Sequence, residues 1–384
     1  MHISIDRSEE DRLRKEIFSR TDTESLRMQR YLSMPDLSRT DGSPLHEIVK
    51  RVSAVPALRD FDVIEIPEIV PADVSFDLFD FEADHPARSK SDTYYADDNN
   101  ILRTHDTVFW YYYLNHPEIK EKISRGEALG ALCYGKVYRK DEIDSRHMNV
   151  FHQFGGWYLA PDSESVVPED LHKVLGDIVH AVFGDAQKFR IKPDTFPYTD
   201  PSFEVELDVT GTAAEGPAKG QWLEILGSGM PKKSVLSKMG VEGYHGWAFG
   251  FGLERLAITS MSLPDIRLLW SDDERVKKQL VLGQEFKEVS KFPPVVRDIS
   301  FLVKNTFFPN DYFDLVRETA GDLVEEVALI DKYENAEKFG EDMVSYAYRV
   351  TYRSQEKTLT AEEVDTLHKR LEQATKEVYN ATVR

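Results

Sequence analysis

The sequence holds a single cysteine, Cys133, among 384 residues. One cysteine excludes an intramolecular disulfide framework and a cysteine-rich zinc site, so we expect no zinc. Cys133 stands in a strand-like run, which predicts a small buried core residue. No uninterrupted apolar stretch approaches the roughly 20 residues of a membrane-spanning helix, and we therefore expect no membrane association.

Basic residues are scarce relative to acidic ones. The 48 Lys and Arg face 68 Asp and Glu, for a formal net charge of −20 at pH 7. From residue 285 onward, 14 Lys and Arg are again outnumbered by 20 Asp and Glu. A protein that binds a nucleic acid normally has a basic surface, so RNA binding here would require its basic side chains to gather on one face.

The first residues, MHISIDRSEEDRLRKEIF, are too charged for a secretory signal and too acidic for a typical organellar presequence. We therefore expect a cytoplasmic protein. The mitochondrial matrix is the alternative, with a presequence that this sequence does not display.

A glycine-rich stretch, GWAFGFGLERLAI, covers residues 246–258. Its glycines leave room for a ligand close to the backbone, and the apolar spacing turns helical at Leu253. Arg255 then lies in the first turn of a helix, where a cation opposes the helix dipole, so an anion such as phosphate is its expected partner. A dinucleotide fingerprint is excluded because Arg255 replaces its third glycine. An ordinary strand–turn–helix with a solvent-exposed arginine stays open.

Upstream, two strand-like runs, 131–139 and 149–159, flank a charged connection, and this pattern predicts an antiparallel hairpin. The alternation of side chains along paired strands presents Arg139, Phe151 and Gln153 together. An arginine fork can neutralise a phosphate, and a phenyl ring can stack on a purine. Taken singly, Arg139 could equally form a surface ion pair, and Phe151 could pack in the core.

Three parts follow from the pattern along the chain. Residues 1–43 are polar and contain one amphipathic helix from about Glu9 to Tyr31. Residues 44–283 alternate short strands with helices, which predicts an α+β domain with an antiparallel sheet flanked by helices. Residues 284–384 have the order β-α-β-β-α, typical of a ferredoxin-like module, and Thr360 with Glu363 predicts a capping box at its last helix.

Several stretches occur in an order that resembles the phenylalanyl-tRNA synthetases, in the single-chain form that fuses a class II catalytic core to a ferredoxin-fold anticodon-binding domain. The resemblance covers about nine-tenths of the chain. The stretches are HPARSKSDTYY (85–95), LRTH (102–105), YRKDEIDSRH (138–147), FHQ (151–153), FPYTDPSFEVE (196–206), WLEILGSGM (222–230), residues 246–258, PDIRLLW (264–270), KFPPVVRDISF (291–301) and YRSQEKTLTAEEV (352–364).

The resemblance implies that the protein activates L-phenylalanine with ATP to phenylalanyl-adenylate and transfers the amino acid to tRNA(Phe). Mg²⁺ would arrive with ATP. The matching positions give two catalytic arginines, Arg139 and Arg255, and an ATP site formed by Arg139, Asp141, Glu142, His147, Phe151 and Arg255. The candidate metal carboxylates are Asp200 and Glu224, either of which could instead be structural.

The resemblance also implies an amino-acid site formed by Tyr95, His105, Thr107, Gln153, Phe196, Tyr198, Ala248 and Gly250. Phe196 and Tyr198 would sandwich the substrate ring. The sequence departs from the family's pattern at two places. Residues 106–110 read DTVFW, and the customary Leu-Glu after FHQ is Phe154-Gly155, so a carboxylate that helps to bind the ammonium group is missing. Asp106 and Asp141 are candidates to replace it.

Three alternatives stay open. The first is a related class II enzyme, such as an O-phosphoseryl- or pyrrolysyl-tRNA synthetase, although a phosphoserine site would need cations where Phe196 and Tyr198 stand. The second is a non-catalytic RNA-binding paralogue. The third is an α-like subunit that needs a partner chain, against which the fused module argues. The stretch 61–70 usually forms a dimer interface in the family. We expect the chain's own segments to cover it, giving a monomer.

Overall fold

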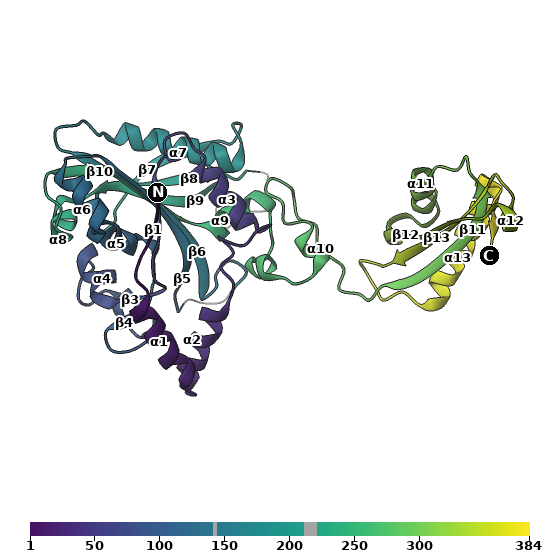
Figure 1. Cartoon of the computed structure of the whole chain (residues 1–384), viewed down its shortest axis with the longest axis horizontal. Helices are drawn as coiled ribbons and strands as arrows, with labels where there is room; N and C mark the ends of the chain where they lie inside the picture. Colours follow the sequence, from purple (N-terminus) through teal and green to yellow (C-terminus); the bar gives the residue numbers. More distant parts are fainter. Residues whose placement is uncertain (141–143, 211–220) are drawn as a thin grey trace. The chain divides into compact units, whose positions relative to one another are not determined.

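The computed structural model describes residues 1–140, 144–210 and 221–384 (Figure 1). The chain divides into two compact units, Met1–Phe286 and Lys287–Arg384. Among the described residues, no helix combines the length and the apolar character needed to cross a membrane. Cys133 is buried, as predicted.

A large sheet organises the first unit. Its strand order is β1-β2-β5-β6-β10-β9-β8-β7, antiparallel except for the parallel pairs β1/β2 and β2/β5. This sheet, with its flanking helices, confirms the α+β prediction. The strand bounds are β1 His2–Ser4, β2 Asp62–Glu65, β5 Leu129–Tyr138, β6 Val150–Pro161, β7 Phe189–Asp194, β8 Thr199–Asp208, β9 Trp222–Pro231 and β10 Tyr244–Gly252.

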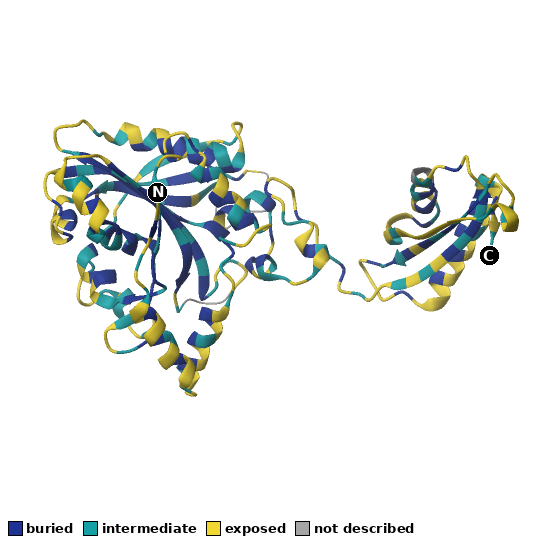
Figure 2. Ribbon diagram, in the orientation of Figure 1, coloured by how far each residue is buried: buried dark blue, intermediate teal, exposed yellow. Residues whose placement is uncertain are grey.

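The predicted hairpin is present as β5 and β6, with Val137 opposite Phe151 and Gly135 opposite Gln153. Because side chains alternate along a strand, Phe151, Gln153 and Gly155 of β6 face one side of the sheet and the intervening residues face the other. The central strands are largely buried (Figure 2).

Helices cover both faces of the sheet. Three helices, α3, α7 and α9, contact one another, and α7 and α9 also contact strands of the sheet. Apolar residues of α5, α6 and α8 join Trp157 and Ala248 in a buried cluster on the other face. The bounds are α3 Pro44–Ser53, α4 Ala72–Phe76, α5 Phe109–Asn115, α6 Pro117–Ser124, α7 Pro168–Phe183, α8 Lys233–Lys238, α9 Leu253–Met261 and α10 Glu274–Lys277, with a small sheet of β3 Ile69–Pro71 and β4 Asn100–Leu102.

The single helix expected from Glu9 to Tyr31 is wrong. Two helices, α1 (Ser8–Ser19) and α2 (Thr23–Ser33), occupy this region. Asp22 ends the continuity because its carboxylate accepts a hydrogen bond from the Ser25 N–H at 2.9 Å and so starts a second helix. The break lets buried Ile17 of α1 and Met28 of α2 join one apolar cluster.

The first 43 residues belong to the first unit and cover the stretch 61–70. Strand β1 pairs in parallel with β2 and occupies the outer edge of the sheet. Arg14 of α1 forms an ion pair with Glu68 at 2.5 Å. The buried Lys136 ammonium donates to the carbonyl oxygens of Leu32 and Met34 at 3.2 and 2.8 Å. These contacts tie both helices to the sheet.

The second unit is a four-stranded antiparallel sheet of order β12-β13-β11-β14 with two long helices. The predicted capping box is confirmed, since the Thr360 hydroxyl accepts from the Glu363 N–H and the Glu363 carboxylate accepts from the Thr360 N–H. The bounds are β11 Val295–Lys304, α11 Pro309–Ala320, β12 Val324–Glu334, α12 Ala336–Phe339, β13 Met343–Tyr352, α13 Ala361–Tyr379 and β14 Thr382–Val383. The ferredoxin-like prediction is confirmed, with β14 as an additional short strand.

Candidate functional site

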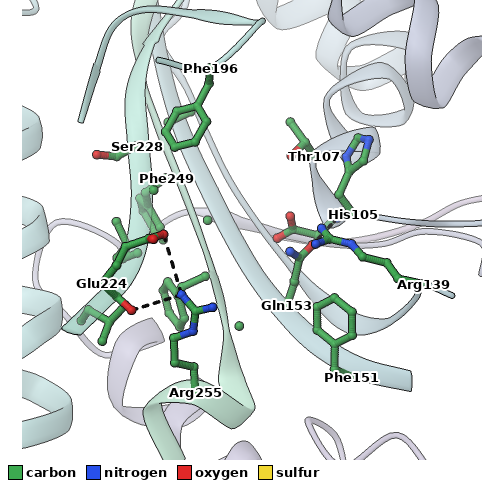
Figure 3. A pocket seen from close by; sticks show the side chains of 18 of the residues that line it. His105, Thr107, Arg139, Phe151, Gln153, Phe196, Glu224, Ser228, Phe249 and Arg255 are labelled. Carbon is green, nitrogen blue, oxygen red and sulfur yellow. Dashed lines mark hydrogen bonds and ion pairs between the residues drawn. The ribbon is translucent and has the colours of Figure 1, made fainter. Parts of the chain in front are cut away.

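A pocket of about 390 Å³ opens on the face of the large sheet that carries Trp157 and Ala248 (Figure 3). This volume is enough for a small organic ligand. The predicted site residues that line it are His105, Thr107, Arg139, His147, Phe151, Gln153, Phe196, Tyr198, Glu224, Ala248, Gly250 and Arg255.

Four predicted residues are not brought to the pocket or cannot be placed. Tyr95 does not line it, because its hydroxyl instead donates to the Arg88 carbonyl at 2.8 Å. Asp200 is exposed and also lies outside the lining. Asp141 and Glu142 fall outside the described residues.

One side of the pocket comes from the hairpin β5–β6 and the stretch that follows β4. Arg139 is anchored by its Nε, which donates to the Thr104 carbonyl at 3.0 Å, and its guanidinium lies 5.1 Å from the centre of the Phe151 ring. The Gln153 Oε1 accepts from the Asp106 N–H at 2.9 Å. The hairpin therefore presents a cation, an aromatic face and an amide to the same space (Figure 3).

Two titratable side chains, His105 and Asp106, lie beside that amide. They stand at the start of the turn Asp106–Val108. His105 Nε2 lies 3.0 Å from the Ser75 carbonyl, and burial lowers the pKa of His105 to about 4, so the ring is neutral at pH 7. Burial raises the pKa of Asp106 to about 7, against the opposing effect of Arg103 and Arg139. The site can thus hold a carboxyl group that changes charge near neutral pH.

The opposite side has an aromatic wall over a floor without bulky side chains. The Phe196 and Tyr198 rings stack at 6.1 Å, and Tyr198 also meets Trp110 edge-to-face at 6.0 Å. A Cβ at Gly227 would lie 2.8 Å from the tip of the Phe196 ring, so only glycine allows this ring position. Burial raises the pKa of Tyr198 to about 12, which keeps its hydroxyl protonated. The wall is suited to an aromatic side chain.

Arg255 approaches from α9, across the pocket from Arg139 (Figure 3). Its Nη1 donates to the Glu224 carbonyl at 3.1 Å and lies 3.7 Å from Glu224 Oε1. The Arg255 side chain is 48% exposed, so the pair leaves guanidinium surface available to a ligand. Burial raises the pKa of Glu224, and the nearby Arg255 opposes this shift.

A buried ionic network lies behind β6. His152 is fully buried, and its Nδ1 lies 2.6 Å from Glu254 Oε1, while its Nε2 lies 3.3 Å from Asp36 Oδ1. The Leu37 N–H also points at Nε2, at 2.9 Å, an arrangement that favours the neutral ring. Burial opposes the charge as well, but two carboxylates outweigh both effects and raise the pKa of His152 to about 9.

No group of three or more His, Cys, Asp and Glu with the geometry of a metal site occurs among the described residues. Glu224 is the candidate carboxylate that does line the pocket. This fits Mg²⁺, which commonly binds through one or two carboxylates together with substrate phosphates and water.

The sequence prediction missed part of the pocket. Trp110, Gly227 and Ser228 line it without having been assigned a role, whereas Asp106, a candidate from the sequence for the missing carboxylate, does lie in its wall. Trp110 attracted notice only as a departure from the family's pattern. Gly227 could have been found from the run LGSGM, because a glycine opposite another glycine on a neighbouring strand marks a shallow floor.

Comparison with known proteins agrees with both units. The model of the tRNA synthetases class II core domain (F) matches residues 30–280, and that of the ferredoxin-fold anticodon binding domain matches residues 290–384. A chloroplastic/mitochondrial phenylalanine--tRNA ligase of Arabidopsis thaliana is 38% identical over 332 residues, covering 83% of this chain and 72% of the relative. A mitochondrial phenylalanine--tRNA ligase of Mus musculus is 36% identical over 361 residues, covering 84% and 74%.

The sheet, its helices and the matched core domain place the chain among the class II aminoacyl-tRNA synthetases, with an anticodon-binding domain of ferredoxin fold attached. Within that class, the chain belongs to the family of the phenylalanine--tRNA ligases.

Proposed function

We propose that this protein activates L-phenylalanine with ATP, transfers the phenylalanyl group to tRNA(Phe), and performs both steps in the pocket of the first unit. The observation that carries the proposal is the placement of Arg139 and Arg255 on opposite sides of one pocket with an aromatic wall (Figure 3). Membership of the family supports the choice of phenylalanine.

In activation, the amino-acid carboxylate attacks the α-phosphate of ATP and pyrophosphate leaves. Two anions must be held together, and negative charge builds up in the transition state, so fixed cations are the main requirement. Arg139 contacts the carboxylate and the α-phosphate, and its anchored Nε holds it in position. Arg255 neutralises the phosphates from the other side.

The adenine base and the outer phosphates of ATP bind along the β5–β6 hairpin. Phe151, which already lies against the Arg139 guanidinium, stacks on adenine. His147 reaches the outer phosphates from the rim of the pocket, where Asp144 Oδ1 lies 3.0 Å from its Nδ1. Asp141 and Glu142 contact adenine or the amine. Glu224 would hold the Mg²⁺ that accompanies ATP, and the bound ion would supply positive charge to the leaving pyrophosphate.

The amino acid occupies the other half of the pocket. Phe196 and Tyr198 hold the phenyl ring, and Ala248 and Gly250 leave space below it. Gln153 and Thr107 bind the polar end of the substrate, with the neutral His105 beside them.

The anticodon-binding module recruits tRNA(Phe) through basic side chains gathered on one face, and the release of counterions from the contacted phosphates makes this binding weaken steeply with salt. The protein acts as a monomer, since β1, α1 and α2 cover the stretch 61–70. The cytoplasmic location stays a prediction, and the organellar names of the relatives favour the mitochondrial alternative.

ATP–pyrophosphate exchange with each of the twenty amino acids tests the proposal. We expect exchange with phenylalanine as the best substrate and a loss of about 100-fold or more in Arg255→Ala. Arg59→Ala, an exposed arginine far from the pocket lining, is the control and should leave exchange unchanged. Exchange led by another amino acid would overturn the specificity, and silence with all of them would favour a non-catalytic RNA-binding protein.

A further inference from the structure

A row of small residues crosses the sheet beneath the pocket. In register, Cys133 of β5 lies opposite Gly155 of β6, Gly155 opposite Gly250 of β10, and Gly250 opposite Gly227 of β9. Asp106 lies above this row. A Cβ at Gly155 would overlap Asp106 Oδ2, and a Cβ at Gly250 would lie 3.7 Å from Oδ1. The space at Gly155 is therefore filled by the carboxylate of Asp106.

This carboxylate is buried without full hydrogen bonding. Asp106 is only 4% exposed, and among the described residues its Oδ2 has no hydrogen-bond partner. Its own N–H is used by Gln153. Arg103, the buried cation nearby, directs its Nε and Nη1 to the Lys136 and Ile66 carbonyls. A buried acceptor left unsatisfied is costly, so an Asp106 Oδ2 at the pocket wall points to a donor supplied by the ligand.

The surroundings define that donor. The wall opposite is aromatic, formed by Trp110 and Tyr198. The titratable and charged groups that interact with Asp106 are Arg103, Arg139, Tyr198 and Cys133, and His105 precedes it in the chain. The Tyr198 hydroxyl and the Cys133 thiol stay protonated because burial raises the pKa of each to about 12. Arg103 and Arg139 bring positive charge that favours the ionised carboxylate and opposes the effect of burial.

We propose that the Asp106 carboxylate binds the α-ammonium group of the substrate amino acid, in the space that Gly155 and Gly250 leave on the sheet. This inference rests on the proposed function, because it assigns a residue to the amino-acid half of the same pocket. Asp106 anchors the ammonium end, while the aromatic wall of Phe196 and Tyr198 holds the ring. Recognition then requires a free amino group and an aromatic side chain together.

The first test is Asp106→Asn, which keeps the shape and removes the charge. We expect the KM for phenylalanine in ATP–pyrophosphate exchange to rise about 30- to 300-fold. The KM for ATP should stay within about twofold. Asp62→Asn, which removes a buried carboxylate bonded to Tyr113 and Lys122 away from the pocket, is the matched control and should leave the KM for phenylalanine unchanged.

The outcomes separate the two claims. Absence of phenylalanine-dependent exchange in the unmodified protein would overturn the proposed function itself. Exchange in the unmodified protein together with a KM for phenylalanine within about threefold in Asp106→Asn would overturn the role of Asp106 alone.

Two further measurements apply even if Asp106→Asn folds poorly. In the double variant Asp106→Gly with Gly155→Asp, the carboxylate returns to the same space from strand β6, and we expect at least about tenfold recovery of the KM relative to Asp106→Gly. In the unmodified protein, 3-phenylpropionate, which lacks the amino group, should inhibit exchange far more weakly than L-phenylalaninol, which keeps it. Equal inhibition by the two analogues would overturn the proposal.

Discussion

His152 and Glu254 form a buried ion pair that joins strand β6 to helix α9 beside the pocket. Nδ1 and Oε1 lie 2.6 Å apart, and the backbone N–H of His152 also donates to Glu254 Oε2 at 2.8 Å. His152 stands between Phe151 and Gln153 on β6, and Glu254 immediately precedes Arg255 on α9. The pair therefore fixes the position of Phe151 and Gln153 relative to Arg255.

Replacing either partner should leave an uncompensated buried charge. We expect Glu254→Gln or His152→Ala to lower the free energy of unfolding by about 3–5 kcal/mol. His245→Ala, which breaks a partly exposed pair with Asp162, should cost less than about 1 kcal/mol. Urea titration followed by tryptophan fluorescence isolates the first unit, because all five tryptophans lie within it. Equal losses in the two kinds of variant would contradict this prediction.

The same pair makes stability depend on pH. The pKa of His152 is about 9 in the folded protein and about 6.5 when unfolded, so its charged form contributes fully below pH 6.5. That contribution is lost as pH rises through 9. The difference in unfolding free energy between the unmodified protein and His152→Gln should therefore shrink from pH 6 to pH 9.5, as measured by urea titrations across that range. A difference that grows with pH would rule this out.

In contrast to His152, the charge of Asp106 should lower the stability of the fold while it favours binding of phenylalanine. Its pKa is about 7 when folded, above the ordinary value near 4, so the charge destabilises the fold increasingly as pH rises from about 4 to 7. Asp106→Asn should raise the free energy of unfolding at pH 8 by up to about 4 kcal/mol, and by less than this at pH 5.5. In the unmodified protein, affinity for phenylalanine should fall as pH drops below 7. A variant less stable than the parent at pH 8 would contradict the expectation.

Gly155 should be intolerant of a methyl group because of Asp106. A Cβ there would overlap Asp106 Oδ2, so Gly155→Ala must displace the carboxylate. We expect the KM for phenylalanine to rise about tenfold. In an Asp106→Asn background the same substitution should add little to the KM, and this non-additivity in a double-mutant cycle is the decisive measurement. Full additivity would mean that the glycine acts independently.

Mg²⁺ dependence should distinguish the two candidate carboxylates. Glu224 lines the pocket beside Arg255, whereas Asp200 is exposed outside it. Glu224→Gln should raise the Mg²⁺ concentration for half-maximal exchange several-fold, because one oxygen ligand loses its charge. Asp200→Asn serves as the control and should not change it. The reverse result would move the metal position out of the pocket.

Tyrosine should be activated at a measurable rate. The floor near Ala248 is apolar, and an apolar pocket rejects an added hydroxyl only on the order of 100-fold. The two matched domains of this chain are a synthetase core and an anticodon-binding domain, and we predict that the chain does not hydrolyse Tyr-tRNA. Exchange with tyrosine and incubation with preformed Tyr-tRNA check both statements, and rapid clearance of Tyr-tRNA would refute the second.

Patterns within short stretches of sequence predicted individual hairpins and helix caps. Alternation defined the β5–β6 hairpin, and the spacing of Thr360 and Glu363 defined the last helix cap. The break at Asp22 was missed because its apolar spacing continues on both sides. The three-residue strand β1 is too short and polar to produce a periodic signal.

The sequence predicted the site residues that stand close together in one hairpin. It did not predict contacts that depend on the packing of segments far apart in the sequence. Arg139, Phe151 and Gln153 share one hairpin, so alternation placed them together. The fit of Asp106 against Gly155 depends on how the turn after β4 packs over the sheet, which no local pattern contains. Tyr95 was assigned from the family alone, and its hydroxyl is taken by the Arg88 carbonyl.

Alternate residues of strand β6 face opposite sides of the sheet, with Phe151 and Gln153 on the side of the pocket. A one-residue deletion between Phe151 and Trp157 would shift the register and exchange the two faces. His152 would then face the pocket, and Gln153 would face α9. Strand β6 therefore cannot tolerate insertions or deletions, whereas the exposed turn after Pro161 can accept insertions. The length of β6 is therefore constrained more strongly in evolution than its individual side chains, because a conservative substitution cannot correct a shift in register.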